Sequence, residues 1–503
     1  MTIRSVVPLA ALVAGWSALL AVGACTRPGD RPARVPAGRL GAAPLALPLP
    51  VGPGQRWSAV RRHQKAGLPF ALLETRHVSG LTLVVVPMNS PGVIGYGTLV
   101  RVGARDEVEP GQIGFARLIR RLMARGTRRF PAARRRAALR ALGANVNSYT
   151  NKDRTLYYVV GRAGSLEQIV RLEADRIASL EYALPVFETE TRAALGEYRH
   201  WQANPWFAAW EQAHRTAFRR HPYGHVAISR PSDVQAASKR YVASRQFYRR
   251  FYTPDNTTII IAGDVKLARA RALVDKHYGA WRGHAQASRI VPEPPQTTAR
   301  RAHVDWATRT VPRLLIAYRI PAFLTTGNDS AAVQVINALS FGEASPLHRE
   351  LVLRRQLASK LYVENSPSRD PHLFLVFAEL TRPEHAAEVE RAVTAELASL
   401  AAGKIDPRRV TAVRRHIKYS LLMVLNKPRP VIFAVARLVA TRGSAGDFVT
   451  AYGQFDTVSV TDLARVAKRY LIPSRATFVT VHHKVGSPGT SPPSRPPAKR
   501  RPR

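Results

Sequence analysis

The feature that most constrains the fold is a pattern of strands and helices that occurs twice along the 503 residues. In the first occurrence, apolar runs predict strands at 81–87, 94–103 and 257–262, and helical periodicity covers 112–125, 131–142, 164–181, 185–203 and 266–279. A polar stretch at 283–299, which contains three prolines, follows and indicates a linker.

The second occurrence again combines strands and helices. Strands are predicted at 314–320, 372–378 and 476–481, and helices at 329–340, 345–355, 384–402, 406–424 and 460–470. We therefore predict an α+β fold of two homologous domains, 58–282 and 300–484, each a sheet with helices and joined by the linker 283–299. Each domain holds roughly 200 residues, a usual size for one hydrophobic core.

The two ends of the chain differ from this body. Residues 1–25 have an apolar run that ends in small residues before Cys25, which predicts a signal peptide and resembles a bacterial lipobox. Lipidation of Cys25 would anchor the protein to a membrane, and a single membrane-spanning anchor is the alternative. By resemblance to bacterial sorting rules, Thr26 favours a periplasm-facing lipoprotein of the outer membrane. Composition predicts a disordered tether at 26–57 and a disordered basic tail at 485–503.

Charge and cysteine content exclude several kinds of function. Cys25 is the only cysteine, so its acylation leaves no thiol for a disulfide, a thiolate metal site or a cysteine nucleophile. The formal net charge of +42 favours anionic lipids or acidic partners, or it reflects an Arg- and Ala-rich composition throughout. No nucleic-acid-binding signature accompanies the charge, so we predict no specific nucleic-acid partner.

The helix at 112–125 carries the most informative local pattern. Leu118, Ile119 and Leu122 form an apolar stripe beside a basic stripe of three arginines, and Gly126 suits a left-handed helix cap. A stripe of Arg117, Arg120 and Arg121 is typical of a solvated face, and an anion site for carboxylate or phosphate is the alternative. The spacing alone does not decide between them.

A series of short motifs in a fixed order resembles the insulinase-like zinc metallopeptidases, which include pitrilysin and the mitochondrial processing peptidase. The resemblance covers about residues 60–484 and implies the two-domain metallohydrolase fold of that family. It rests on Val102–Glu107 with Gly111–Gly114, Gly126–Pro131, Asn145–Tyr157, Leu172–Arg176, His221–Gly224, Phe251–Asn256 with Gly263-Asp264, and Ser345–Val352 with Gln356–Ala358.

Active members of that family carry H-x-x-E-H on the helix, with a glutamate far downstream as the third zinc ligand. Laid onto this chain, the two histidines fall on Arg117 and Arg121, the catalytic glutamate on Arg120 and the downstream ligand on Glu197. Arginine has no lone pair for a metal and stays protonated. We therefore predict that zinc is lost, with no cofactor, and that Glu197 pairs with Arg117 or Arg121; an exposed Glu197 is the alternative.

The resemblance also bears on substrate binding. Active two-domain members grip the peptide backbone with an Arg and a Tyr seven residues later; here those positions are Val352 and Ser359, and the pair Arg355 and Tyr362 has the same spacing by chance. The stretch from Asn147 to Tyr157 matches the edge strand that pairs with substrate, so Asn147, Ser148 and Thr150 are candidate peptide contacts. His214, His221 and His225 are expected to be scattered surface residues, and His200 lies in the wrong helical register to recreate the motif with Glu197.

These observations predict an inactive, envelope-tethered homologue of insulinase-type peptidases. It would act as the non-catalytic or peptide-binding subunit of a heterodimer with an active paralogue that bears H-x-x-E-H, and would bind a peptide or an unfolded protein segment. The alternatives are an active metallopeptidase that uses an unrecognised site, and a basic lipoprotein that binds the envelope.

Overall fold

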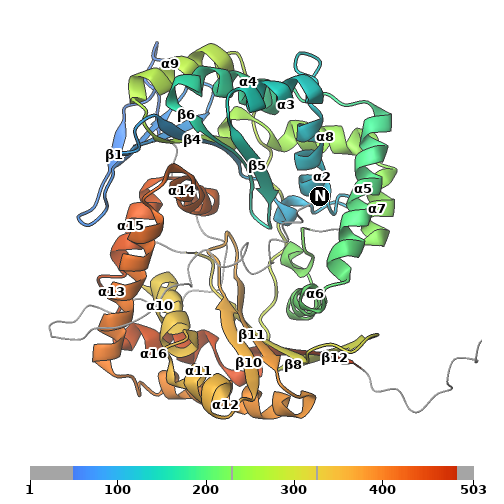
Figure 1. Ribbon diagram of the computed structural model, residues 1–503, viewed down its shortest axis with the longest axis vertical. Helices are drawn as coiled ribbons and strands as arrows, with labels where there is room; N and C mark the ends of the chain where they lie inside the picture. The colour runs from blue at the N-terminus through green and yellow to red at the C-terminus, as the bar shows by residue number, and fades with distance from the viewer. Residues whose placement is uncertain (1–48, 228–229, 324–326, 484–503) are drawn as a thin grey trace, which may run out of the picture.

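Two β-sheets with helices packed around them make up the structure, a computed structural model that describes residues 49–227, 230–323 and 327–483 (Figure 1). The first sheet has seven strands in the order β1-β2-β3-β7-β4-β6-β5, and the second has five in the order β10-β11-β9-β12-β8. The predicted mixed α and β architecture of two sheet-plus-helix units is confirmed.

Most neighbouring strands are antiparallel, and β3–β7 and β12–β8 are the parallel pairs. The strands are β1 (Arg61–His63), β2 (Leu72–Arg76), β3 (Thr82–Pro87), β4 (Val93–Val100), β5 (Asn145–Thr150), β6 (Thr155–Arg162), β7 (Thr257–Gly263), β8 (Arg300–Trp306), β9 (Arg313–Ile320), β10 (Ala358–Glu364), β11 (His372–Leu380) and β12 (Ala476–His483). The predicted strands correspond to β3, β4, β7, β9, β11 and β12. The stretch Asn147–Tyr157 is a correction, because it is a hairpin of β5 and β6 rather than one strand.

The helices include every one that periodicity predicts. The first half contains α2 (Phe115–Leu122), α3 (Ala132–Ala141), α4 (Leu166–Ala178), α5 (Leu184–Gln202), α6 (Pro205–Ala217), α7 (Pro231–Ser238), α8 (Tyr241–Phe251) and α9 (Leu267–Tyr278). The second half contains α10 (Asp329–Ile336), α11 (Pro346–His348), α12 (Ala386–Ala401), α13 (Pro407–Val424), α14 (Pro428–Arg442), α15 (Gly446–Gln454) and α16 (Val460–Tyr470). Sequence periodicity misses α6, α7, α8, α14 and α15.

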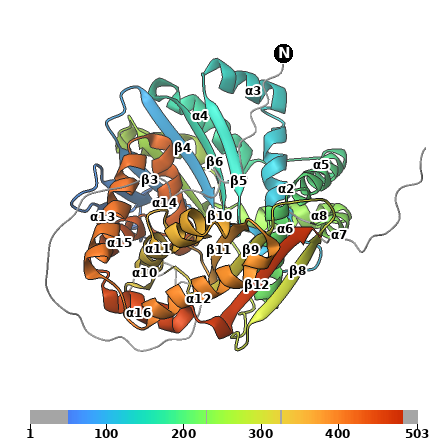
Figure 2. The same cartoon turned by 60° about the horizontal axis from the view of Figure 1, so that its bottom comes forward.

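The two halves exchange helices. Helix α14, from the second half, packs on the first sheet against β4 and β7, and α6, from the first half, packs on the second sheet against β8, β9 and β12 (Figures 1 and 2). Each sheet therefore completes its core with side chains from the other half: Ile432 and Val435 lie with Leu99 and Ile260 in one cluster. A boundary at 283–299 separates the sheets in sequence without separating their cores.

Glycines in β4 permit the close approach of α14. A Cβ on Gly97 would lie 2.6 Å from Ile432 Cγ2, and one on Gly95 would lie 2.6 Å from Ile432 Cδ1. Ile432 itself is fully buried. Glycine inside a strand is typical of a place where another element approaches the backbone, and here that element comes from the far end of the chain.

Buried charges also join the halves. The guanidinium group of Arg105, in the first half, pairs with Asp370 in the second, where Asp370 Oδ2 also lies 3.3 Å from His221 Nε2. In the linker, the Glu293 carboxylate accepts hydrogen bonds from the main-chain N–H groups of residues 219–221. The linker is thus held in place by defined contacts.

The chain ends bear on the predicted boundaries. The signal peptide, Cys25, most of the tether and the tail at 485–503 lie outside the described residues. Trp57, the last residue of the predicted tether, bridges to His77 and donates to Asp275 Oδ2 at 3.0 Å. Within the described ranges, no helix has the length and apolar character needed to cross a bilayer.

We predict strong coupling between Gly97 and Ile432. Ile432→Ala should cost about 2–5 kcal/mol of stability through loss of buried volume, and Gly97→Ala about 1–3 kcal/mol through overpacking. The double variant should lose less stability than the two single variants lose together, because the smaller residue 432 leaves room for the new methyl group. Urea unfolding measures all three.

Gly164→Ala is the matched control, because a Cβ there meets no atom within 4 Å. It should change stability by less than about 0.5 kcal/mol. Strictly additive effects of Gly97→Ala and Ile432→Ala would contradict the packing of α14 on β4.

Candidate functional site: the arginine face of α2

A buried carboxylate fixes the start of α2. Glu107 accepts hydrogen bonds from the main-chain N–H groups of Gly114 at 2.8 Å and Ala116 at 2.9 Å. Burial raises the pKa of Glu107 well above its usual value. Gly114 has φ 95°, a left-handed conformation that favours glycine, and the helix then buries Phe115, Leu118, Ile119 and Leu122. The apolar stripe is therefore the core face, which leaves the arginines on the other side.

Helix α2 lies against α5 (Figure 1). The side of α2 that carries Arg117, Arg120 and Arg121, here called the arginine face, contacts α5 through ion pairs. Arg117 binds the Glu197 carboxylate through two nitrogens, with Nε 3.1 Å from Oε2. Arg121 bridges two carboxylates, with Nε 2.8 Å from Glu190 Oε2 and Nη1 3.3 Å from Glu197 Oε2. Arg125 also pairs with Glu190. The pairing predicted for Glu197 is present, and the arginine face is an ion-pair network rather than a solvated surface.

The electrostatics of Glu197 follow from these contacts. Its side chain is 24% exposed. Burial acts to raise the pKa of the carboxyl group, but the hydrogen bond from Arg117 and the charges of Arg117 and Arg121 outweigh it, so the pKa is lowered. Glu197 is therefore held as a carboxylate.

Arg120 differs from its two neighbours. Its Nη1 lies 3.4 Å from both the carbonyl oxygen and the Oγ of Ser148 on β5. No carboxylate lies within ion-pair distance of it among the described residues, and its Nε is buried without a hydrogen-bond partner there. The three arginines thus divide into two that are neutralised and one that is not.

The candidate peptide contacts lie on β5, at the open edge of the first sheet. Asn147 is exposed, and its Oδ1 accepts the main-chain N–H of Ser148 at 2.7 Å. Thr150 is a correction: its side chain is buried and shares a 3.0 Å hydrogen bond with Thr155 across the hairpin, so it is not available to a peptide. Asn147 is exposed at the edge, and Ser148 is half-buried there beside Arg120.

The residues present do not fit a zinc ion. The positions that would supply imidazole and carboxylate carry guanidinium groups, which are permanently positive and have no lone pair to donate. Both carboxylates beside them are already engaged by arginines. The described part of the chain contains no group of three or more His, Cys, Asp or Glu residues placed to hold a metal.

The histidines do not lie as expected. His214 and His221 are buried at the junction of the halves rather than on the surface. Burial lowers the pKa of His214 to about 4. Its Nδ1–H donates to the Trp210 carbonyl oxygen, 3.0 Å away. His225 is half-buried, and His200 is exposed. Their surroundings are those of packing residues.

The second-half positions take structural roles. Val352 packs against the core, and Ser359 is exposed on β10. Arg355 pairs with Glu388, and Tyr362 stacks on Phe377. Arg355 and Tyr362 therefore serve separate contacts, which agrees with a chance spacing.

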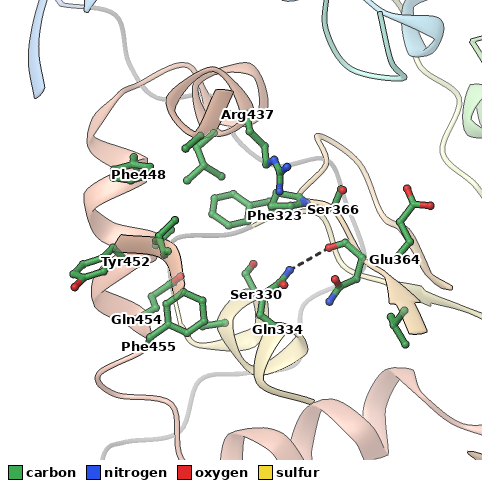
Figure 3. Close-up of a pocket in the computed structure, with 18 residues that line it drawn as sticks. Phe323, Ser330, Gln334, Glu364, Ser366, Arg437, Phe448, Tyr452, Gln454 and Phe455 are labelled. Atoms are coloured by element: carbon green, nitrogen blue, oxygen red, sulfur yellow. Dashed lines mark hydrogen bonds between the residues drawn. The ribbon is translucent and has the colours of Figure 1, made fainter. Parts of the chain in front are cut away.

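Two cavities lie outside the arginine face. One of about 460 Å³ is bordered by the capping residue Glu107 and by four arginines, Arg215, Arg219, Arg220 and Arg289. The other, of about 70 Å³, lies between α10, α14 and α15 and is largely apolar, with aromatic walls from Phe323, Phe448 and Phe455 and the Arg437 side chain at one side (Figure 3).

Family profiles match most of the body of the chain. The profile described as "Insulinase (Peptidase family M16)" matches residues 89–230, and the one described as "Peptidase M16 inactive domain" matches residues 243–417. The chain belongs to the insulinase-type peptidase family. The first match contains α2, α5 and β5, and with them the arginine face, whereas the second match begins after these elements.

Individual relatives support the same assignment. The zinc protease PqqE of Helicobacter pylori is 26% identical over 80% of this chain and 90% of its own length, and an uncharacterized zinc protease of Mycobacterium leprae is 25% identical over 82% and 92%. A protease structure from Helicobacter pylori superposes with a TM-score of 0.76 at 25% identity, over 82% of this chain and all of that one. A putative M16-like peptidase from Alicyclobacillus acidocaldarius, at 19% identity and TM-score 0.73, shares the fold over 83% of this chain and 99% of its own.

Sequence reasoning missed two members of the network of this insulinase-type chain, Glu190 and Arg125. Helical spacing contained the signal: Glu190 lies seven residues before Glu197 on α5, and Arg125 four residues after Arg121. Residues seven apart on one helix share a face. Two carboxylates on one face of α5 therefore match a row of arginines on α2.

We predict that Glu197 stabilises the fold only where it is ionised. Because its folded-state pKa is lowered, its contribution is present above the ordinary pKa of about 4.3 and is lost as the pH falls through the folded value. Glu197→Gln should cost about 1–2 kcal/mol at pH 7, and the difference from wild type should shrink towards pH 3. Urea unfolding at several pH values measures this.

Glu188→Gln removes the same charge from an exposed position of α5 and should have little effect at any pH. An effect of Glu197→Gln that does not change with pH would contradict the ion-pair assignment.

Proposed function

We propose that this chain is a non-catalytic insulinase-type subunit in which arginine side chains take the place of the metal. The observation that carries the proposal is the engagement of Glu197, the position of the third ligand, by Arg117 and Arg121. The pairing supplies positive charge between α2 and α5 with no group that activates water. According to this proposal, the site neither binds zinc nor hydrolyses peptides.

The proposed partner is an active relative that carries H-x-x-E-H. Two relatives, from Arabidopsis thaliana and Blastocladiella emersonii, are named as β subunits of mitochondrial processing peptidases, so members of the family work in subunit pairs. In such a pair, one subunit carries the catalytic site and the other contributes a binding surface. Our proposal gives this chain the second role.

The surface that suits this role is β5. An open sheet edge binds an extended peptide through main-chain hydrogen bonds, and β5 is the terminal strand of its sheet. The same strand carries Asn147 and Ser148 beside the arginine face. A peptide or unfolded segment would therefore lie along β5 in the former active-site region.

A lipid on Cys25 is the proposed anchor. It rests on the sequence before Cys25, which is typical of bacterial lipoproteins facing the periplasm. Tethering would keep the subunit and its partner together at the membrane, where the effective concentration of one for the other is high.

We predict that mild solubilisation of native membranes and affinity capture of the full-length protein yield a complex with a second insulinase-type chain. Mass spectrometry of the complex should identify H-x-x-E-H in that partner. Recovery of the protein as a monomer alone would contradict the partner role. Cys25→Ala is the control for anchoring, and it should move the protein from the membrane fraction to the soluble fraction.

A further inference from the structure

The arginine face has more positive charge than its acids neutralise. Arg117, Arg121 and Arg125 share the carboxylates of Glu190 and Glu197. Arg120 lies on the same helix and is left with two contacts of 3.4 Å to Ser148. Its guanidinium group is therefore the one member of the α2 stripe without an acidic partner in the described structure.

The surroundings of Arg120 make an unpaired charge unfavourable. The side chain is half-buried, and its Nε is out of contact with solvent and without a partner in the described residues. Burial, together with the like charge of Arg117, lowers the pKa of Arg120. A desolvated cation without a counter-charge costs free energy that a bound anion recovers. The site is thus preorganised for an anion.

The main chain of β5 indicates that the anion belongs to a bound peptide. The Ser148 N–H donates to Asn147 Oδ1 and its carbonyl faces Arg120. In an antiparallel ladder, the N–H and C=O of one residue point to the same side, so both groups of Ser148 point to the open edge, away from β6. A strand that pairs with β5 would therefore pass directly beside the Arg120 guanidinium group.

We propose that Arg120 selects extended peptides that carry a carboxylate at the position facing Ser148. This inference rests on the proposed peptide-binding function and names its substrate class. Arg120 would exchange its two long contacts with Ser148 for a charge-assisted pair with the peptide and would free the Ser148 carbonyl for a main-chain hydrogen bond. Since β5 extends from Asn145 to Thr150 on both sides of Ser148, an internal Asp or Glu fits better than a chain terminus.

The test measures binding of three fluorescein-labelled, C-terminally amidated peptides of about ten residues, long enough to span a strand. They alternate Thr and Val and differ only in a central Glu, Gln or Lys. Fluorescence anisotropy with the full-length protein should give about tenfold tighter binding of the Glu peptide than of the Gln peptide, as one charge-assisted pair provides. The Lys peptide should bind more weakly than the Gln peptide.

Variants assign the preference to Arg120. Arg120→Gln should bring the Glu and Gln peptides to equal affinity while binding of the Gln peptide persists. Arg136→Gln removes the same charge from an exposed position on α3 and should leave the preference unchanged. A Gln peptide with a free C-terminal carboxylate tests whether Arg120 binds a chain terminus instead of a side chain. We expect this peptide to bind no better than its amidated form.

The outcomes separate this inference from the function on which it rests. Equal binding of the Glu and Gln peptides to the wild-type protein would overturn acid selection and leave peptide binding intact. Binding of none of the peptides would overturn both. The wild-type comparison needs no variant, so it decides the matter even if Arg120→Gln does not fold.

Discussion

Glu197 needs a positive charge between α2 and α5, because a carboxylate that has lost much of its water is stable only beside a counter-charge. The resemblance to zinc-binding members of the family implies that a metal cation would meet that need there. Here Arg117 binds the carboxylate through two nitrogens and Arg121 joins it to Glu190. The relative position of the two helices therefore depends on guanidinium groups, and so does the access of a peptide to β5. Unlike a metal ion, these groups are covalently attached and cannot dissociate.

The wider architecture is held by contacts between distant parts of the sequence. Helix α14 fills the first sheet through Ile432 against Gly95 and Gly97, and α6 covers the second sheet. Arg105 and Asp370 pair at the buried junction. Since each sheet needs a helix from the other half, the two halves are expected to lose their structure together when either core is disrupted.

Local pattern predicted most of the fold, and the resemblance to the insulinase-type family predicted part of the site. The strands β3, β4, β7, β9, β11 and β12 follow from apolar runs, and the pairing of Glu197 follows from the placement of the motif on Arg117 and Arg121. The exchange of α6 and α14 was not predicted, because the periodicity of a helix identifies its apolar face and not the surface it meets. Gly95 and Gly97 in a strand gave a signal of close approach without naming Ile432 as the residue that approaches. The state of Arg120 required the structure, since only distances separate a paired from an unpaired arginine.

If guanidinium groups have replaced the metal, the purified full-length protein does not retain zinc, so its zinc content is the decisive measurement. The protein is incubated with equimolar zinc, freed of unbound metal by gel filtration and analysed by mass spectrometry of the element. A variant with Arg117→His, Arg120→Glu and Arg121→His, which restores the donor set around Glu197, is measured in parallel. We expect no retained zinc in the wild-type protein and about one ion per chain in the variant. Retention of about one zinc ion by the wild-type protein would contradict the account.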